Sequence, residues 1–297
     1  MASLKEQRLR IASVKSTQKI TSAMKMVAAA KLRRAQEAAI AGRPYAAKMT
    51  AMLAAVLTSG YQPDEALPLL SGTGADKVHL LIIIGTDRGL CGGFNTQIFR
   101  AARRQIRDLE EAGKTVKLLC IGRKARDVFS REFGKKVIAS YTDLTRKGLH
   151  YDAVAQITSR LQDLLTEGAF DVCQVLYNKF RSAMVQTPTW KQIIPLPSDD
   201  AWIPESGVPG KVRAQYEFEP SAQELLTTLL PRNLTVQLYS ALLDSIASEH
   251  GARMTAMDNA TRNAGDMIRN LTLSYNRTRQ AMITKELIEI ISGAEAL

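Results

Sequence analysis

Both ends of this 297-residue chain carry long stretches that are nearly free of helix-breaking residues. The first stretch, residues 4–56, contains one glycine and one proline, and the second, residues 231–291, opens on its only proline and contains two glycines. An α-helix of about 60 residues is roughly 90 Å long, which is far more than the width of one domain. The two ends therefore predict two long helices, and the residues of a globular core must lie between them.

Small and apolar residues recur along both stretches with the spacing of a coiled coil. In the first stretch, the two rows are Ala28, Ala35, Gly42, Met49 and Val56, and Leu32, Ala39, Ala46 and Leu53. In the second stretch, they are Ala247, Met254, Thr261, Ile268, Tyr275 and Met282, and Leu243, His250, Met257, Ala264, Leu271 and Thr278. Each pair of rows is called a seam below. Two seams in one chain predict an intramolecular antiparallel coiled coil, and its polar members predict that other subunits support it.

The middle of the chain has a different period. Short apolar runs at residues 78–84, 116–121, 137–141 and 171–177 are typical of buried strands. Helical patterns separate these runs at residues 96–111, 123–132 and 151–167. Alternation of strands and helices predicts a Rossmann-like α/β domain with a mostly parallel sheet. The predicted fold class is thus α/β plus coiled coil.

We divide the chain into an N-terminal coiled-coil helix (residues 1–60), a central α/β domain (77–218) and a C-terminal coiled-coil helix (220–297). Residues 198–214 are rich in Pro, Gly, Asp and Ser and predict a loop, and residues 216–218 are a candidate edge strand. Pro220, Ser221 and Glu224 predict the start of the last helix, and Pro231 either kinks that helix or opens its main part.

The net charge of +11 is concentrated in the first helix, because residues 1–60 carry eleven Lys/Arg and only Glu6 and Glu37. Such a surface suits an acidic protein, an anionic membrane or nucleic acid. The basic face lacks interleaved aromatic residues, and no nucleic-acid-binding module is recognisable, so we expect no nucleic acid partner. The longest strongly apolar run, residues 80–84, is too short to span a membrane.

The glycine-rich segment GTDRGLCGGFN, residues 85–95, follows the first strand, where phosphates often bind to backbone N–H groups. It fits neither the Walker nor the dinucleotide pattern, so a tight turn that serves as a protein contact is the competing interpretation. His79, His150 and His250 are isolated, and the three cysteines have no metal-ligand spacing. We therefore expect reduced thiols and no metal, cofactor or catalytic residue.

The last turns carry apolar residues on several sides of one helix, which a single partner helix cannot cover. These residues are Ile283, Leu287, Ile288, Ile290, Ile291 and Leu297. We expect another protein to enclose this end, as a fixed socket or as a bearing.

Four segments resemble the gamma subunit of F-type ATP synthase. They are QKITSAMKMVAAAK (residues 18–31), TDRGLCGG (86–93), ARMTAMDNA (252–260) and NRTRQAMITKELIEIISG (276–293). These matches lie in order along essentially the whole chain, and residues 198–214 resemble the family least.

The resemblance implies a non-catalytic rotor. The terminal helices would form a shaft inside a ring of three alpha and three beta subunits, and the α/β domain would hold the epsilon subunit and the membrane c-ring. Proton flow would turn the shaft, which couples it to ATP synthesis or hydrolysis in the ring.

The resemblance also implies roles for single residues. Arg279 and Gln280, with Arg277 beside them, match positions that engage a beta-subunit loop during rotation. Met24 and Lys25 match the shaft surface near an acidic segment of beta. Ile283, Leu287, Ile290 and Leu297 match the shaft end in its apolar bearing.

Two questions stay open from the sequence. The alternative function is a coiled-coil adaptor whose α/β head binds a small ligand. The second question is location. The first helix is basic and poor in acidic residues, as a removable leader would be, but its heptad period continues past Ala46. We therefore interpret it as part of the folded protein and not as a leader. We expect a peripheral protein on the cytoplasmic side of a bacterial inner membrane, with a processed organellar chain as the alternative.

Overall fold

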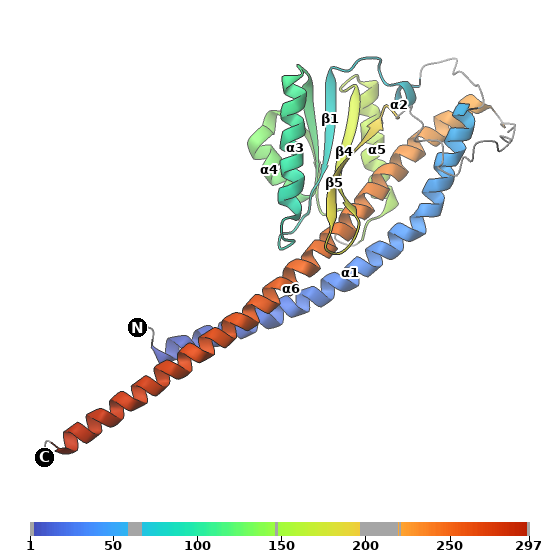
Figure 1. Ribbon diagram of the computed structural model, residues 1–297. Coiled ribbons are helices and arrows are strands. Elements are labelled where there is room, and N and C mark those ends of the chain that lie inside the picture. The colour runs from blue at the N-terminus through green and yellow to red at the C-terminus, as the bar shows by residue number, and fades with distance from the viewer. Residues whose placement is uncertain (1–2, 59–66, 146–147, 197–218, 220, 296–297) are drawn as a thin grey trace, which may run out of the picture. The chain divides into compact units, whose positions relative to one another are not determined.

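The computed structural model describes residues 3–58, 67–145, 148–196, 219 and 221–295 (Figure 1). The chain forms two compact units. Unit 1 consists of Met1–Ala30 and Arg253–Leu297, and unit 2 of Lys31–Ala252. The predicted loop at residues 198–214, the candidate strand at 216–218 and Leu297 lie outside the described residues. The division of the sequence into 1–60, 77–218 and 220–297 stays a prediction.

Unit 2 is built on a five-stranded sheet with the strand order β3-β2-β1-β4-β5. The strands are β1 (Val78–Ile84), β2 (Thr115–Ile121), β3 (Val137–Tyr141), β4 (Val172–Phe180) and β5 (Gln186–Ile194). The first four run parallel, and β5 pairs antiparallel with β4. The helices around the sheet are α2 (Pro68–Ser71), α3 (Phe94–Glu111), α4 (Arg123–Phe133) and α5 (Tyr151–Thr166), and a short 3-10 turn, η1 (Gly134–Lys136), leads into β3.

The mostly parallel sheet is buried on both faces, as its continuous apolar strands predict. Helices α3 and α4 cover one face, where Phe99 and Phe129 pack edge to face with ring centroids 5.4 Å apart. Helix α5 covers the other face together with α6 (Ala222–Glu295), whose Leu234 and Leu238 reach the sheet (Figure 1). The predicted α/β domain is therefore confirmed, with a terminal helix as part of its core.

Strand β5 was not predicted. Its sequence, QTPTWKQII, has no continuous apolar run and contains Pro188. A proline lacks the N–H group that a central strand needs, so its presence argues against a buried strand. In the structure β5 is an edge strand, and Pro188 lies opposite Asn178 of β4.

Unit 1 pairs the start of α1 (Leu4–Thr58) with the end of α6. Four contacts define the register: Gln7 with Thr278, Gln18 with Gly265, Thr21 with Thr261, and Lys25 with Asp258. As one residue number rises, the other falls by nearly the same amount, so the helices run antiparallel. The predicted antiparallel coiled coil is confirmed.

The seam of unit 1 is partly polar. The Thr261 hydroxyl lies 2.8 Å from the Thr21 hydroxyl, and Met257 and Ala264 are buried on either side. A second cluster of α1 and α6 residues belongs to unit 2, where Met49, Leu53 and Leu226 are buried. The heptad spacing thus selects side chains that are buried in both units, such as Met257 and Leu53, whereas Met282 at the far end of its row is 45% exposed.

The described helices include none with enough consecutive apolar residues to cross a membrane. All three cysteines are unbonded and buried. Burial raises the pKa of the Cys120 thiol to about 12 and also raises the pKa of the Cys173 thiol, so these two thiols are poor nucleophiles.

Candidate interaction surfaces

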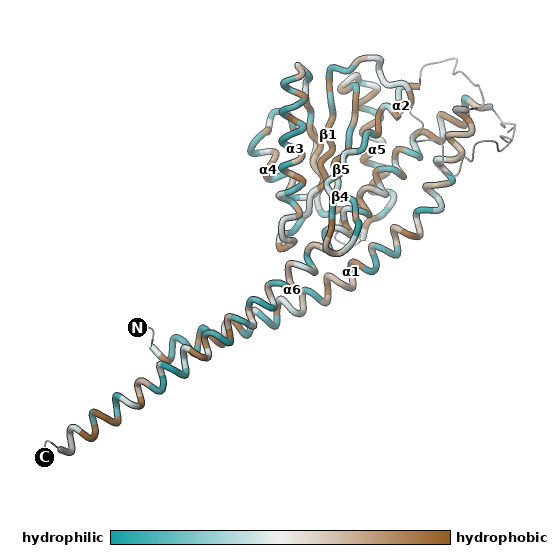
Figure 2. The backbone as a smooth tube through the Cα atoms, viewed as in Figure 1, coloured by the Kyte–Doolittle hydropathy of each residue, from teal (hydrophilic) through white to brown (hydrophobic). Residues whose placement is uncertain are grey.

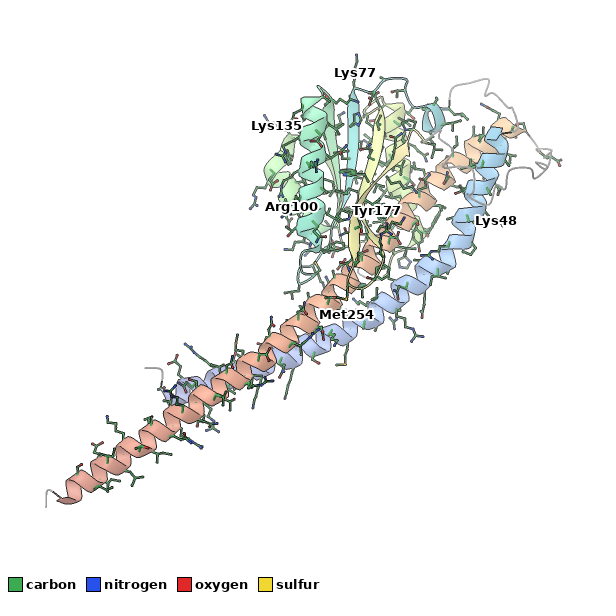
Figure 3. All side chains as sticks on the ribbon, viewed as in Figure 1. Lys48, Lys77, Arg100, Lys135, Tyr177 and Met254 are labelled. Carbon is green, nitrogen blue, oxygen red and sulfur yellow. The ribbon has the colours of Figure 1, made fainter. Side chains whose placement is uncertain are left out.

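The last turns of α6 form an exposed helix end, which we define as residues 279–292 and call the tip. Every side chain of the tip is exposed (Figure 3), including the apolar Ile283, Leu287 and Ile290, at 49%, 53% and 70%. Apolar residues recur along this stretch in Figure 2. The register explains the exposure, because the partner of residue 279 is close to Leu4, where α1 begins. The tip is therefore a helix without a partner helix.

Polar groups that were predicted to touch a beta-subunit loop lie at the base of the tip. Arg277, Arg279 and Gln280 are exposed, and neither guanidinium has an ion-pair partner among the described residues. Their positions leave them available to another protein. The structure brings them together with Ile283 on one helix end, as the sequence implied.

Lys25 lies in a different setting. Its ammonium group is 2.5 Å from Asp258 Oδ1 across the seam, and Arg262 donates to the other oxygen of the same carboxylate. These two hydrogen bonds, the one from Lys25 being the larger cause, lower the pKa of Asp258. The heptad spacing already indicated that Lys25 lies at the seam, because it precedes the seam residue Leu32 by seven positions. Met24 beside it is half-buried.

Other basic residues of α1 are better placed to meet an acidic partner, and sequence reasoning did not single them out. Lys5, Arg8, Lys15 and Lys19 are exposed, and in the described parts of the chain they form no ion pair. The sequence could have identified these four residues, because none of them lies in the rows that form the seam.

The glycine-rich turn after β1 satisfies its own polar groups. Asn95 donates to the Thr86 hydroxyl at 2.8 Å and accepts from the Thr86 N–H at 3.2 Å. Asp87 Oδ1 accepts the backbone N–H groups of Arg123 and Asp143, at 2.9 and 3.1 Å. The carboxylate thus occupies the N-terminus of α4, where a phosphate would otherwise bind.

Little space lies beside that turn. A residual cavity of 20 Å³ separates the carboxyl ends of β1 and β2 from Leu242 and Ser245 of α6. A cavity of this size has room for about one water molecule and is far too small for a nucleotide. Gly122 tightens the site further, because a Cβ there would lie 2.5 Å from the Gly85 carbonyl oxygen. The arrangement favours a tight turn over a nucleotide site, and the turn exposes the apolar Leu90.

The histidines have structural surroundings. His79 Nε2 lies 2.6 Å from Asp76 Oδ1, and His150 is the residue that precedes α5. The described residues contain no group of three His, Cys, Asp or Glu side chains that could hold a metal ion.

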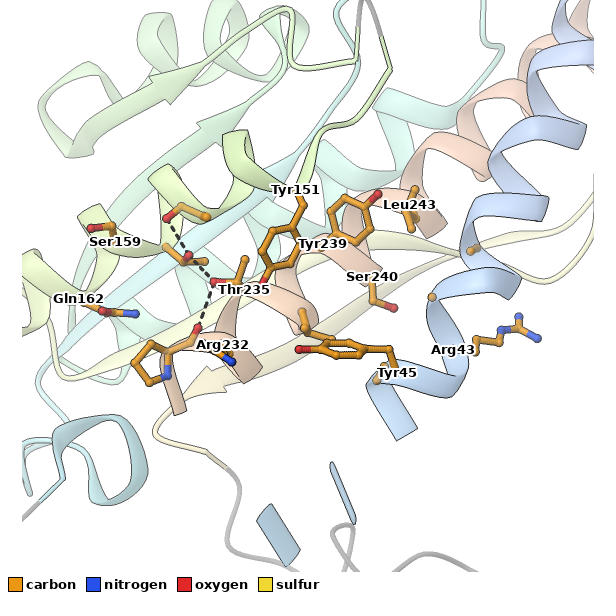
Figure 4. A pocket seen from close by; sticks show the side chains of 17 residues that line it. Arg43, Tyr45, Tyr151, Ser159, Gln162, Arg232, Thr235, Tyr239, Ser240 and Leu243 are labelled. Atoms are coloured by element: carbon orange, nitrogen blue, oxygen red, sulfur yellow. Dashed lines mark hydrogen bonds between the residues drawn. The ribbon is translucent and has the colours of Figure 1, made fainter. Parts of the chain in front are cut away.

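Unit 2 also contains a groove between α1, α5 and α6, with a volume of 880 Å³ (Figure 4). Tyr45 comes from α1, Tyr151 from α5 and Tyr239 from α6, and the last two rings pack edge to face at 5.8 Å. On its floor, the Thr158 and Thr235 hydroxyls are 2.7 Å apart. Desolvation, more than any neighbouring charge, raises the pKa of Tyr151. Nothing in the sequence pattern predicted this groove.

Comparison with known proteins covers the whole chain. Residues 3–297 match the family model described as ATP synthase. The ATP synthase gamma chain of Paramagnetospirillum magneticum is 54% identical over 299 residues, and that of Granulibacter bethesdensis is 56% identical over 302 residues. Each alignment spans 100% of both chains.

Solved structures agree with these matches. A chain from the central stalk and c-ring of Tetrahymena thermophila mitochondrial ATP synthase is 26% identical with a TM-score of 0.59, covering 81% of this chain and 99% of its own. A chain of the Euglena gracilis mitochondrial enzyme, 20% identical, has a TM-score of 0.68 over 99% of this chain and 94% of its own, and supports the fold. The chain therefore belongs to the gamma-chain family of F-type ATP synthases.

Proposed function

We propose that this chain is the central-stalk rotor subunit of an F-type ATP synthase. It couples proton flow through the c-ring to ATP synthesis or hydrolysis in the alpha and beta subunits, and it carries no catalytic residue itself. The observation that carries this function is the tip, a helix end that continues past its partner helix with exposed apolar side chains on several sides. A helix of this kind is stable in water only when another protein encloses it.

The unequal ends of the two helices explain how such a shaft can act. Near the tip the shaft is one helix, whereas at Thr21 and Thr261 it is two helices packed together. A surrounding ring therefore meets a different surface at each orientation of the shaft. A ligand shifts a conformational equilibrium only through differential contact with the two states, and a rotating asymmetric shaft supplies such contacts in turn.

Roles follow for single residues at the two ends of the chain. Arg279 and Gln280, with Arg277 beside them, engage a loop of the beta subunit. Ile283, Leu287, Ile290 and Leu297 run in an apolar bearing. Met24 and the exposed cations of α1 face an acidic segment of beta, and Lys25 contributes through its pairing with Asp258, which supports the shaft.

The partners of this function are three alpha and three beta subunits, the epsilon subunit and the c-ring. The gamma chains named above come from bacteria. We infer a peripheral position on the cytoplasmic side of the bacterial inner membrane. The adaptor alternative is not favoured, because the turn that would bind its ligand has a cavity of 20 Å³.

Co-purification tests the assignment. An affinity-tagged chain isolated from its own cells should bring down alpha and beta subunits in equal numbers and should show little ATPase activity when separated from them. Isolation of the intact chain without either subunit would contradict the function.

Charge reversal at Arg279 tests the proposed torque contact. Arg279→Glu should slow ATP-driven rotation and proton pumping of the assembled complex about 10-fold or more, which corresponds to at least about 1.4 kcal/mol. Arg100→Glu on α3 is the control, because Arg100 is also exposed and lies in unit 2 (Figure 3). Equal rotation rates in the two variants would remove the role of Arg279.

A further inference from the structure

Helix α6 is the part of the shaft that is built into unit 2. Its Leu234 and Leu238 belong to the buried cluster on one face of the sheet, and Ala252 packs against the cluster on the other face. Among the described residues, neither cluster includes a side chain of α1. Ala39 and Ala46 of α1 instead border the groove. The sheet therefore holds one of the two shaft helices directly, and that helix is α6.

Near its exit from unit 2, α6 lies against the end of β4 and against residues 181–185, which we call the β4–β5 turn. Ser248 is completely buried and donates its hydroxyl proton to the Asn178 carbonyl oxygen of β4 at 3.0 Å. One helical turn later, a Cβ added at Gly251 would lie 3.2 Å from the Ala183 Cα, which is closer than ordinary van der Waals contact. The absence of a side chain at Gly251 thus lets the helix meet the β4–β5 turn backbone to backbone.

The β4–β5 turn is stiff, because it is closed by its own hydrogen bonds. The Ser182 N–H donates to the Val185 carbonyl oxygen at 3.1 Å, and the Ser182 hydroxyl accepts the Val185 N–H at 3.1 Å. The Gln186 side-chain amide donates to the Ala183 carbonyl oxygen at 2.8 Å. That same oxygen would lie 3.4 Å from a Cβ at Gly251. Ala183 therefore cannot yield to a side chain on α6 unless the β4–β5 turn moves as a whole.

We propose that the β4–β5 turn is a clamp on α6, with Ser248 and Gly251 as positioning residues, and that torque passes between unit 2 and the shaft through this contact. Helix α6 is continuous from Ala222 to Glu295, so a load applied at the clamp is carried along one helix to the tip. A loose contact here would let the shaft twist before unit 2 followed, and part of each step would be lost as elastic motion. The inference rests on the proposed rotor function, since the clamp carries a load only if the chain turns.

Angular fluctuations of the rotor in the assembled complex test the inference. All three cysteines are buried, so Lys135→Cys, at an exposed position of unit 2 (Figure 3), gives one labelling site for a bead. The ring of alpha and beta subunits, free of exposed cysteines, is fixed to a surface, and the angle of the bead is followed while bound nucleotide holds the shaft at rest. At a given temperature the variance of this angle rises as the torsional stiffness between the ring and the bead falls.

Gly251→Leu tests the close approach of α6 to the β4–β5 turn. The inserted side chain meets backbone atoms of Ala183, so it should displace the turn and raise the angular variance of the bead about 2-fold or more. Gly265→Leu is the matched control, because it also removes a glycine from α6, but its Cβ meets the flexible end of Gln18, at 3.2 Å. Equal variance in the two variants would overturn the clamp.

A shortened β4–β5 turn tests the same contact from the other side and leaves α6 unchanged. Asn-Gly, which closes two-residue hairpins, replaces residues 182–185 and removes the contact of Ala183 with Gly251. The variance should rise as it does in Gly251→Leu. If ATP turns the bead in the natural complex but the variance rises in only one of these two variants, or in neither, the clamp is wrong and the rotor function stands. If ATP does not turn the bead in the natural complex, the rotor function itself fails.

Discussion

Unit 2 encloses its own core, whereas unit 1 leaves much of its apolar surface uncovered. In unit 2 the middle strand β1 is buried over six consecutive residues, His79 to Ile84, and both faces of the sheet carry helices. In unit 1 the buried seam residues are few, and Thr21 and Thr261 replace apolar pairs with a hydrogen bond. The tip has no covered face at all. One chain thus combines a domain that is stabilised internally with a shaft whose stability depends on other proteins.

This difference explains why the polar seam is tolerated. A coiled coil that folded alone would need Leu or Ile at most seam positions. A shaft enclosed by a ring gains additional contacts from outside, so Thr residues in its seam cost less stability. The difference also predicts that core substitutions change the free energy of unfolding, whereas tip substitutions change coupling.

The largest effect on stability is expected in the core of unit 2. Phe129 is completely buried against Phe99, so Phe129→Ala should reduce the free energy of unfolding by about 3–5 kcal/mol. Trp190 packs against the same cluster and reports the transition by fluorescence, in a Trp202→Phe background that removes the other tryptophan. Urea titration of the two proteins gives the difference in the free energy of unfolding.

The neighbouring phenylalanine is the control for this prediction. Phe133 stacks on Phe129 but is only half-buried, so Phe133→Ala should cost clearly less. A loss below about 1 kcal/mol for Phe129→Ala would show that unit 2 is not stabilised by this core.

A smaller effect is expected at the close approach between β1 and β2. Gly122 has a φ of +94° and no room for a Cβ, whereas Gly113 has a φ of +74° and open space. Gly113→Ala should cost about 1 kcal/mol, because an L residue is strained at positive φ. Gly122→Ala should cost at least about 3 kcal/mol, because its Cβ also displaces backbone. Equal losses of unfolding free energy in the Gly113 and Gly122 variants would mean that the close approach of Gly122 to Gly85 adds nothing to the cost.

The smallest effect is expected at the ion pair of unit 1. The pKa of Asp258 is lowered in the folded state, so its stabilisation is present above its unfolded pKa, about 3.9, and is lost as the pH falls through the folded value. Thermal unfolding at 222 nm should show a difference between the natural chain and Asp258→Asn at pH 5 that narrows toward pH 3. Asp266→Asn is the control, because Asp266 meets Arg269 only at 3.8 Å. A constant difference would contradict the pairing.

The sequence predicted the elements whose packing follows a simple period. Residues 78–84 and 137–141 were predicted as strands with the observed bounds, because buried parallel strands are continuous apolar runs. The heptad spacing correctly selected Met257 and Ala264 as seam residues. Strand β5 was missed because an edge strand is paired on one side only, so it tolerates Pro188 and polar residues.

The groove could not be predicted, for a related reason. Ala39, Gly42 and Ala46 have the same heptad spacing as the buried Ala28 and Ala35, yet they line an open volume. A seam pattern shows which side chains face a partner helix, but not how near that helix lies. That distance depends on α5, whose Tyr151 and Thr158 also border the groove.

The central claim is that unit 1 is completed by the subunits around it, and hydrogen exchange tests it most directly. In the isolated chain the tip has no tertiary contact, and a helix of this length is marginal alone, so its amides should exchange rapidly. In the complex with alpha and beta subunits, amides of residues 279–292 should exchange on the order of 100-fold more slowly, while those around Met257 should change far less. Equal exchange of the tip in the two states would contradict the account.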